Sequence, residues 1–130
     1  MLQLLVEKGG ADLNIRNKFG ASVMHIAAQK DQALSIYYFA QRGIDINIKD
    51  DKNCTPLHWA CFKGSEMALI YILSLKPNLE AQDVRGLTPL HIAVNSAGKL
   101  GSTRCVKTLL ISGSNREAKD HEGKTPREWV

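Results

Sequence analysis

Apolar residues occur along the chain in pairs of short clusters, and polar stretches rich in turn-forming residues separate these pairs. In the middle of the chain, the first cluster covers 57–62 and the second lies within 66–75. The second cluster contains the apolar residues Met67, Ala68, Ile70, Ile72 and Leu73. The pattern predicts a short helix over 57–62 and a second helix from 66 to about 75.

Residues that begin and end helices flank both clusters. Thr55 is a suitable N-cap, because its hydroxyl can accept a hydrogen bond from a free helix amide, and Pro56 suits the first helical position. Gly64 breaks the first helix, and Ser65 is predicted to cap the second. Pro77 disfavours a helical conformation for the residue before it, so the second helix is expected to end by residue 75.

The same arrangement repeats along the whole chain. His25, His58 and His91 are separated by 33 residues each time. The blocks 21–28, 54–61 and 87–94 align with one another, and the block beginning at Lys124 follows after 37 residues instead of 33. Two further sets share the period: Asn17, Asp50 and Asp83, and Ala27, Ala60 and Ala93. Such periodicity is typical of repeat proteins, in which stacked neighbours supply the stability that one unit lacks.

The segments between the units are predicted to be tight turns. Residues 50–53 and 83–86 run from an Asp to an Asn or a Gly, which tolerate the left-handed backbone that closes a turn. These turns would link one helix pair to the next.

Thr-Pro-Leu-His at 55–58 and 88–91, together with Gly-x-Asp-x-Asn beginning at Gly10 and Gly43, resembles the ankyrin repeat over essentially the whole chain. The resemblance implies an all-α solenoid of stacked helix-turn-helix units joined by β-turn loops. It also implies that each repeated histidine hydrogen-bonds the backbone of a neighbouring loop.

The period divides residues 1–130 into parts of a single array. Residues 1–16 form a partial repeat, 17–49, 50–82 and 83–119 are full repeats, and 120–130 begin a further one. Apolar side chains of the first part are expected to be partly uncovered: Leu2, Leu4, Leu5 and Val6. Four extra residues within 95–103 are expected to form a protruding, mobile loop. Because neither end resembles a polar capping repeat, the chain is expected to be a section of a longer array.

Composition excludes several classes of protein. With 44% hydrophobic residues in 130, the chain is long enough to bury a core. No run approaches the ~18–20 apolar residues of a membrane helix, and the N-terminal residues lack the features of a secretory signal. The three cysteines, Cys54, Cys61 and Cys105, are an odd number without a CxxC pair, which favours a reducing compartment. We therefore expect an intracellular, cytoplasmic protein with structural cysteines.

Catalytic and metal-binding patterns are not found. Stacked repeats lie roughly 10 Å apart, whereas a metal–nitrogen bond is ~2 Å long, so the repeated histidines are predicted to be structural. No serine lies in a nucleophile elbow, and 98–102 lacks the spacing of a phosphate-binding loop. We predict no catalytic residue, no metal and no cofactor.

The resemblance also implies a concave face made from turn tips, first-helix ends and the residues beside each turn. Matched position by position, the charged and larger apolar residues of this face are Arg16, Lys18, Phe19, Lys30, Lys49, Lys52, Phe62, Lys63, Val84, Arg85, Leu87, Lys119 and Lys124. Its other members are Ala21, Gln29, Asp51, Cys54, Gln82, Asn95, Ser96, His121 and Glu122. Nine of these residues are basic and two are acidic, so the net charge of +4 is predicted to concentrate on one face.

A non-catalytic scaffold is the predicted function, binding a partner protein or a peptide segment that carries acidic residues and apolar anchors. The alternative is that basic tips merely keep the surface soluble. A modest charge and the lack of a recognition motif disfavour nucleic acid.

A second hypothesis comes from the runs 23–32, 55–64 and 102–117, which are similar to ankyrin segments of DHHC-type protein S-acyltransferases. This resemblance implies recruitment of substrates at the cytosolic face of a membrane, with the catalytic part outside this segment. A third hypothesis is a subunit of a large assembly, which would co-purify stably with its partners.

Overall fold

The computed structural model describes residues 15–129, and of Trp129 only the backbone. Leu2, Leu4, Leu5 and Val6, expected to be partly uncovered, lie outside the described residues. Residues 15–129 form six α-helices and a final 3-10 turn, with no strand. They are α2 (Val23–Gln29), α3 (Ala33–Gln41), α4 (Pro56–Lys63), α5 (Glu66–Ser74), α6 (Pro89–Leu100), α7 (Arg104–Ile111) and η1 (Pro126–Trp129). The predicted helices over 57–62 and 66–75 correspond to α4 and α5 within one residue at each end.

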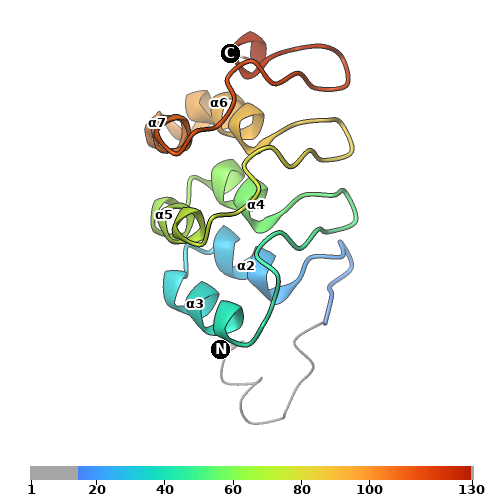
Figure 1. Cartoon of the computed structure of the whole chain (residues 1–130), viewed down its shortest axis with the longest axis vertical. Helices are drawn as coiled ribbons and strands as arrows, with labels where there is room; N and C mark the ends of the chain where they lie inside the picture. Colours follow the sequence, from blue (N-terminus) through green and yellow to red (C-terminus); the bar gives the residue numbers. More distant parts are fainter. Residues whose placement is uncertain (1–14, 130) are drawn as a thin grey trace.

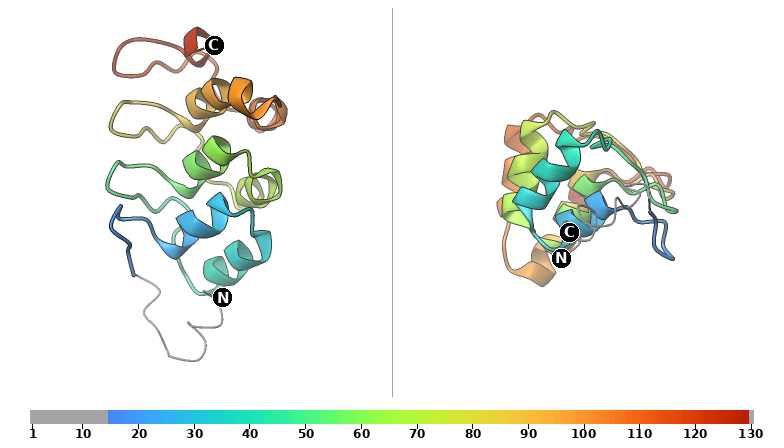
Figure 2. Two further views of the ribbon diagram at one scale, coloured as in Figure 1. Left: turned by 180° about the vertical axis from the view of Figure 1, so that it is seen from behind. Right: turned by 90° about the horizontal axis from the view of Figure 1, so that it is seen from below.

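The helices form two layers along the long axis of the molecule (Figure 1). The inner helices α2, α4 and α6 contact one another in sequence, and the outer helices α3, α5 and α7 do the same. The turns project sideways from the inner layer, so that the molecule seen along its axis has an angular outline (Figure 2, right). The all-helical solenoid predicted from the repeat is confirmed.

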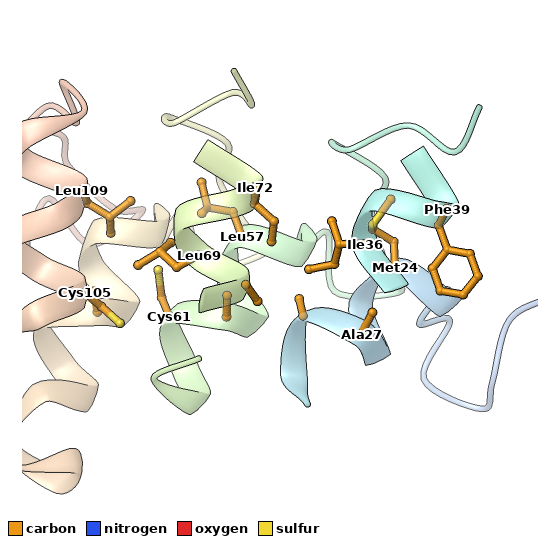
Figure 3. Packing of buried hydrophobic residues seen from close by; sticks show 14 of the residues in the cluster. Met24, Ala27, Ile36, Phe39, Leu57, Cys61, Leu69, Ile72, Cys105 and Leu109 are labelled. Atoms are coloured by element: carbon orange, nitrogen blue, oxygen red, sulfur yellow. The ribbon is translucent and has the colours of Figure 1, made fainter. Parts of the chain in front are cut away.

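The apolar core lies between the inner and outer layers (Figure 3). Within a repeat, Leu57 of α4 faces Leu69 and Ile72 of α5, and all three are almost completely buried. Ala27, Ala60 and Ala93 are buried at equivalent positions of the inner helices, where a small side chain allows neighbouring helices to approach closely. Burying a side chain the size of leucine stabilises a fold by about 1.5–3 kcal/mol, so the buried side chains of these layers stabilise the stack.

Each inner helix begins with a capping box that involves the repeated histidine. In the middle repeat, the Thr55 hydroxyl accepts a hydrogen bond from the His58 backbone amide, and His58 Nδ1 accepts one from the Thr55 amide at 3.0 Å. Because Nδ1 is an acceptor, the ring proton is on Nε2, which lies 2.9 Å from the carbonyl oxygen of Leu87 in the next repeat. His25 reaches Cys54 O (2.7 Å) and His91 reaches Lys124 O (2.9 Å) in the same way. The cross-repeat hydrogen bonds expected of the histidines are therefore present.

Four turns stand in register beside the helices. Each is closed by a backbone hydrogen bond from its fourth residue to its first, across 17–20, 50–53, 83–86 and 120–123. The Asn or Asp that opens each turn accepts two more backbone amides through Oδ1. Amides in successive turns then donate to carbonyls of the preceding turn: Asp51 to Phe19, Val84 to Lys52, and His121 to Arg85. Backbone hydrogen bonds between successive turns therefore hold the repeats together, in addition to the apolar contacts between the helices.

The four extra residues of the third repeat form a helical turn and not the protruding loop that we expected. They extend α6 to Leu100, and Gly101 ends the helix with a left-handed φ of 68°. Because an α-helix has 3.6 residues per turn, an insertion of four adds about one turn and leaves the buried face of the helix almost unchanged. The insertion therefore fits the helix without disturbing the packing before it.

Ser65 does not cap α5 as predicted, since its side chain makes no hydrogen bond to the helix. The Ser65 hydroxyl donates instead to Gln29 O of the preceding repeat at 3.0 Å. The α5 terminus receives its cap from that repeat as well, because Asp31 Oδ1 accepts the Ala68 amide at 2.7 Å. Asp31 of the preceding repeat thus caps α5 in place of Ser65, the residue next to the helix in sequence.

A substitution at the fourth turn position tests the close approach of successive turns. A Cβ on Gly86 would lie 2.6 Å from the backbone nitrogen of His121, whereas a Cβ on Gly123 would meet nothing, although both residues have a φ of 80°. We expect Gly123→Ala to lower the free energy of unfolding by about 1 kcal/mol, and Gly86→Ala by a further ~1–3 kcal/mol. Urea denaturation followed by circular dichroism measures both; equal losses would contradict the steric explanation.

Candidate interaction surface

The inner helices leave one side open to solvent. α4, for example, contacts α2 and α6 along the stack and α5 behind it. The remaining side carries residues at equivalent positions of the three helices, spaced by three and four as on a helix face. They are half-buried Ile26, Trp59 and Ile92, then Gln29, Phe62 and Asn95, then exposed Lys30, Lys63 and, one turn further along α6, Lys99. Together with the turn tips, we call these residues the inner surface.

The turn tips add exposed charged and apolar side chains along the projecting edge. Phe19 and Val84 are about half exposed, at 57% and 51%. The Lys18 amine lies 5.2 Å from the centre of the Phe19 ring, and the Lys63 amine lies 5.8 Å from the centre of the Phe62 ring. At both places a cation is held beside an aromatic ring, which keeps charge and apolar surface together.

Among the charged and larger apolar residues predicted for the concave face, all but Leu87 are exposed. Leu87 is only 6% exposed, because its side chain packs into the structure while its carbonyl oxygen accepts the hydrogen bond from His58. Ala21 and Ser96, smaller members of the predicted face, are buried too. Gln29 and Cys54 are half-buried. The remaining charged and larger apolar residues are exposed: Arg16, Lys18, Phe19, Lys30, Lys49, Lys52, Phe62, Lys63, Val84, Arg85, Lys119 and Lys124.

Arg16 is exposed but also holds two repeats together. Its guanidinium donates to Gly20 O and to Lys49 O, both at 2.8 Å. Gln82 makes the equivalent pair of bonds two repeats later, to Gly86 O at 3.0 Å and Lys119 O at 3.1 Å. The shared feature is a side chain with two N–H donors just before a turn, and the repeat alignment places these two residues at matching positions.

Residues that sequence reasoning missed form the floor and the far end of the inner surface. Ile26, Trp59 and Ile92 precede the predicted residues by one helical turn, and the repeat spacing alone could have identified them. Trp59 also lies at the corner between helix and turn, where its indole N–H donates to Asp50 Oδ2 at 2.9 Å. Lys99 and Leu100 were missed because a loop was expected there.

Of the outer helices, α3 and α5 differ from the inner surface in charge, whereas α7 carries two exposed basic residues, Arg104 and Lys107. The exposed side chains of the first two include large apolar residues, Leu34 and Tyr37 on α3 and Met67 and Ile70 on α5. α3 carries no charged residue, and α5 carries one, Glu66. Apolar exposure therefore occurs on both sides, whereas the combination of apolar and basic residues along successive repeats distinguishes the inner surface.

The histidines and cysteines take part in structure. Within residues 15–129 no group of three His, Cys, Asp or Glu side chains could hold a metal ion. Burial lowers the pKa of His25 and His58, with backbone hydrogen bonding as an opposing influence. Burial, followed by the nearby carboxylates of Asp50 and Asp83, raises the pKa of the half-buried Cys54 thiol to about 12. These thiol and imidazole groups remain neutral near pH 7.

A stack of helix pairs with projecting turns defines a solenoid repeat protein, a class that uses extended surfaces for recognition. The family model of ankyrin repeats, in three copies, matches residues 1–83 and 36–120, and the chain therefore belongs to the ankyrin-repeat family. A comparison with curated proteins found no match. Ankyrin repeats serve as protein–protein interaction scaffolds and are typically non-catalytic. Among residues 15–129, no helix is long and apolar enough to cross a membrane.

The lowered pKa of the buried histidines predicts a loss of stability in acid. As the pH falls below 6.5, the ordinary pKa of histidine, the unfolded chain takes up protons that folded His25 and His58 do not. The contribution of these two histidines to the free energy of unfolding is therefore fully present above that pH and declines below it. We expect His58→Gln to lower the free energy of unfolding by about 1–3 kcal/mol and to reduce its pH dependence. Denaturation at a series of pH values, with exposed His121→Gln as the control, measures this; an unchanged dependence in His58→Gln would contradict it.

The raised pKa of Cys54 predicts slow thiol chemistry despite partial exposure. Since the thiolate is the reactive form, iodoacetamide should modify Cys54 at least roughly 100-fold more slowly in the folded chain than in urea. Mass spectrometry of peptides sampled over time gives both rates. Rapid modification of Cys54 in the folded chain would show that the thiol is not held in its protonated form.

Proposed function

We propose that this chain is a scaffold whose inner surface binds an acidic segment of a partner protein, with apolar side chains of that segment packed between the lysines. The observation that carries the proposal is the repetition of Lys30 and Lys63 at equivalent positions of adjacent repeats, beside exposed Phe62. Charge attraction would steer the partner, and the apolar contacts would supply affinity.

The geometry of the stack favours an extended segment. Packed helices lie about 8–10 Å apart, and an extended chain advances about 3.3 Å per residue. Every third residue of a segment lying along the stack would therefore meet a new repeat. Such a segment could place acidic residues opposite Lys30 and Lys63 and keep apolar residues for the Ile26–Trp59–Ile92 floor.

We also propose a cytoplasmic location, since the free cysteines Cys54, Cys61 and Cys105 suit a reducing compartment. We propose recruitment of substrates for a DHHC-type S-acyltransferase as the second candidate function, on the sequence resemblance of the runs 23–32, 55–64 and 102–117 alone. Sequencing of the full-length transcript discriminates between the two: apolar spans of about 20 residues and a Cys-rich DHHC segment would favour the second candidate.

Selection of random peptides tests the proposed partner chemistry. Peptides of about 12 residues can span the stack when extended, so a phage-displayed library of that length is panned on the chain. We expect enrichment of Asp and Glu, and binding that weakens as salt is raised. The variant Lys30→Glu/Lys63→Glu should lose this enrichment and bind the selected acidic peptides at least roughly tenfold more weakly.

The matched control reverses the same number of charges elsewhere. Lys76→Glu/Lys107→Glu changes an exposed loop residue and an exposed residue of α7, and it should retain acidic selection. Thermal unfolding of both variants shows that each is folded. Equal enrichment of acidic peptides by the wild type and Lys30→Glu/Lys63→Glu, or no acidic enrichment at all, would refute the proposal and leave the lysines as solubilising charges.

A further inference from the structure

The last turn of α6 reaches back to the preceding repeat. We call this turn, residues 97–100, the ledge. α6 has 12 residues where α2 has 7 and α4 has 8, and it extends past them in the view along the stack (Figure 2, right). A Cβ on Gly64, which ends α4, would lie 2.8 Å from a methyl carbon of Leu100. Leu100 therefore rests directly on the end of α4.

Apolar and basic side chains are exposed near the ends of α4 and α6. Leu100 remains 44% exposed, and Phe62, two residues before Gly64, is 56% exposed. Lys63 lies beside the Phe62 ring, and Lys99 precedes Leu100. The next carboxylate along the chain from Gly64 is Glu66, which is paired with Arg104 at 3.1 Å.

The insertion also restores a cation that the repeat pattern would otherwise lack. Lys30 and Lys63 are equivalent, but the third repeat has Ser96 at that position, and Ser96 is buried. The added turn places exposed Lys99 three residues beyond Ser96. An exposed lysine thus occurs near the end of each of the three inner helices, and on the ledge an apolar side chain follows it that the other two repeats do not have.

We propose that the ledge and the end of α4 together bind an apolar side chain that lies next to acidic residues in the bound segment. This inference rests on the proposed function and adds a determinant of specificity to it. Leu100 and Phe62 would contact the apolar side chain, while Lys63 and Lys99 would pair with the acidic residues beside it. Apolar contact framed by complementary charge is the usual composition of an interface centre and its rim.

Peptide selection on ledge variants tests this inference. The same random phage library is panned on the wild-type chain, on Leu100→Ala, and on Ile111→Ala, which removes an 87% exposed side chain from the end of α7. The wild type and Ile111→Ala should enrich peptides with an aliphatic or aromatic residue at one position beside the acidic ones. Leu100→Ala should reduce this apolar preference, and should weaken binding of the best selected peptide by roughly 5- to 10-fold.

A second measurement identifies the contact. Replacing the apolar residue of the selected peptide by Ser should weaken binding to the wild type, yet have little effect on binding to Leu100→Ala, because the partner side chain is already gone. Acidic enrichment that persists in Leu100→Ala together with an unchanged apolar preference would overturn the ledge inference and leave the proposed function standing. Absence of acidic enrichment on the wild type would refute the proposed function itself.

Sedimentation of the free chain tests another occupant. The ledge proposal predicts that the wild type and Leu100→Ala have the same sedimentation coefficient, because the ledge binds a partner segment and not a second copy of the chain. A dimer of the wild type that Leu100→Ala dissociates would show that a second copy covers the ledge, and would overturn the proposal.

Discussion

Each of the three full repeats of this chain depends on one imidazole that bonds in two directions. Nδ1 of the histidine completes the capping box of its own helix, and Nε2 donates to a carbonyl of the following turn. Both bonds require a neutral ring with the proton on Nε2, and burial favours that form in His25 and His58. Local helix initiation and contact between repeats are therefore coupled through the same side chain, and displacing it would affect both.

Turns and caps extend this coupling to the polar parts of the fold. The carboxylate of Asp31 caps a helix of the next repeat, and Arg16 and Gln82 connect carbonyls of successive turns. Hydrogen bonds between repeats thus occur at the turns, at the helix starts and between the helix pairs, while the apolar layers fill the space between them. Equivalent residues of successive repeats therefore lie in a regular row. Because of this spacing, side chains of neighbouring repeats can contact the same ligand.

The residues of the candidate surface were predictable where equivalent positions of successive repeats are exposed alike. Lys30 and Lys63 occupy equivalent positions and are both exposed, as are the charged residues of the turn tips. Leu87 was misplaced because matching by position says where the backbone lies, whereas burial depends on what the next repeat places against it. The floor residue Trp59 was missed for a related reason: half-buried apolar residues resemble core residues until the open side of the helix is known.

Sequence alone determined the class of fold, the turns and the helix starts, because these depend on residues close together in the chain and recur with a fixed period. Only the tertiary structure decided three other features. It showed that the insertion lengthens α6, that Ser65 bonds to the preceding repeat, and that Leu100 lies on Gly64. The last two involve a partner roughly one repeat away, and such a partner is selected by how the helices stack. The spacing of residues along the chain does not identify that partner.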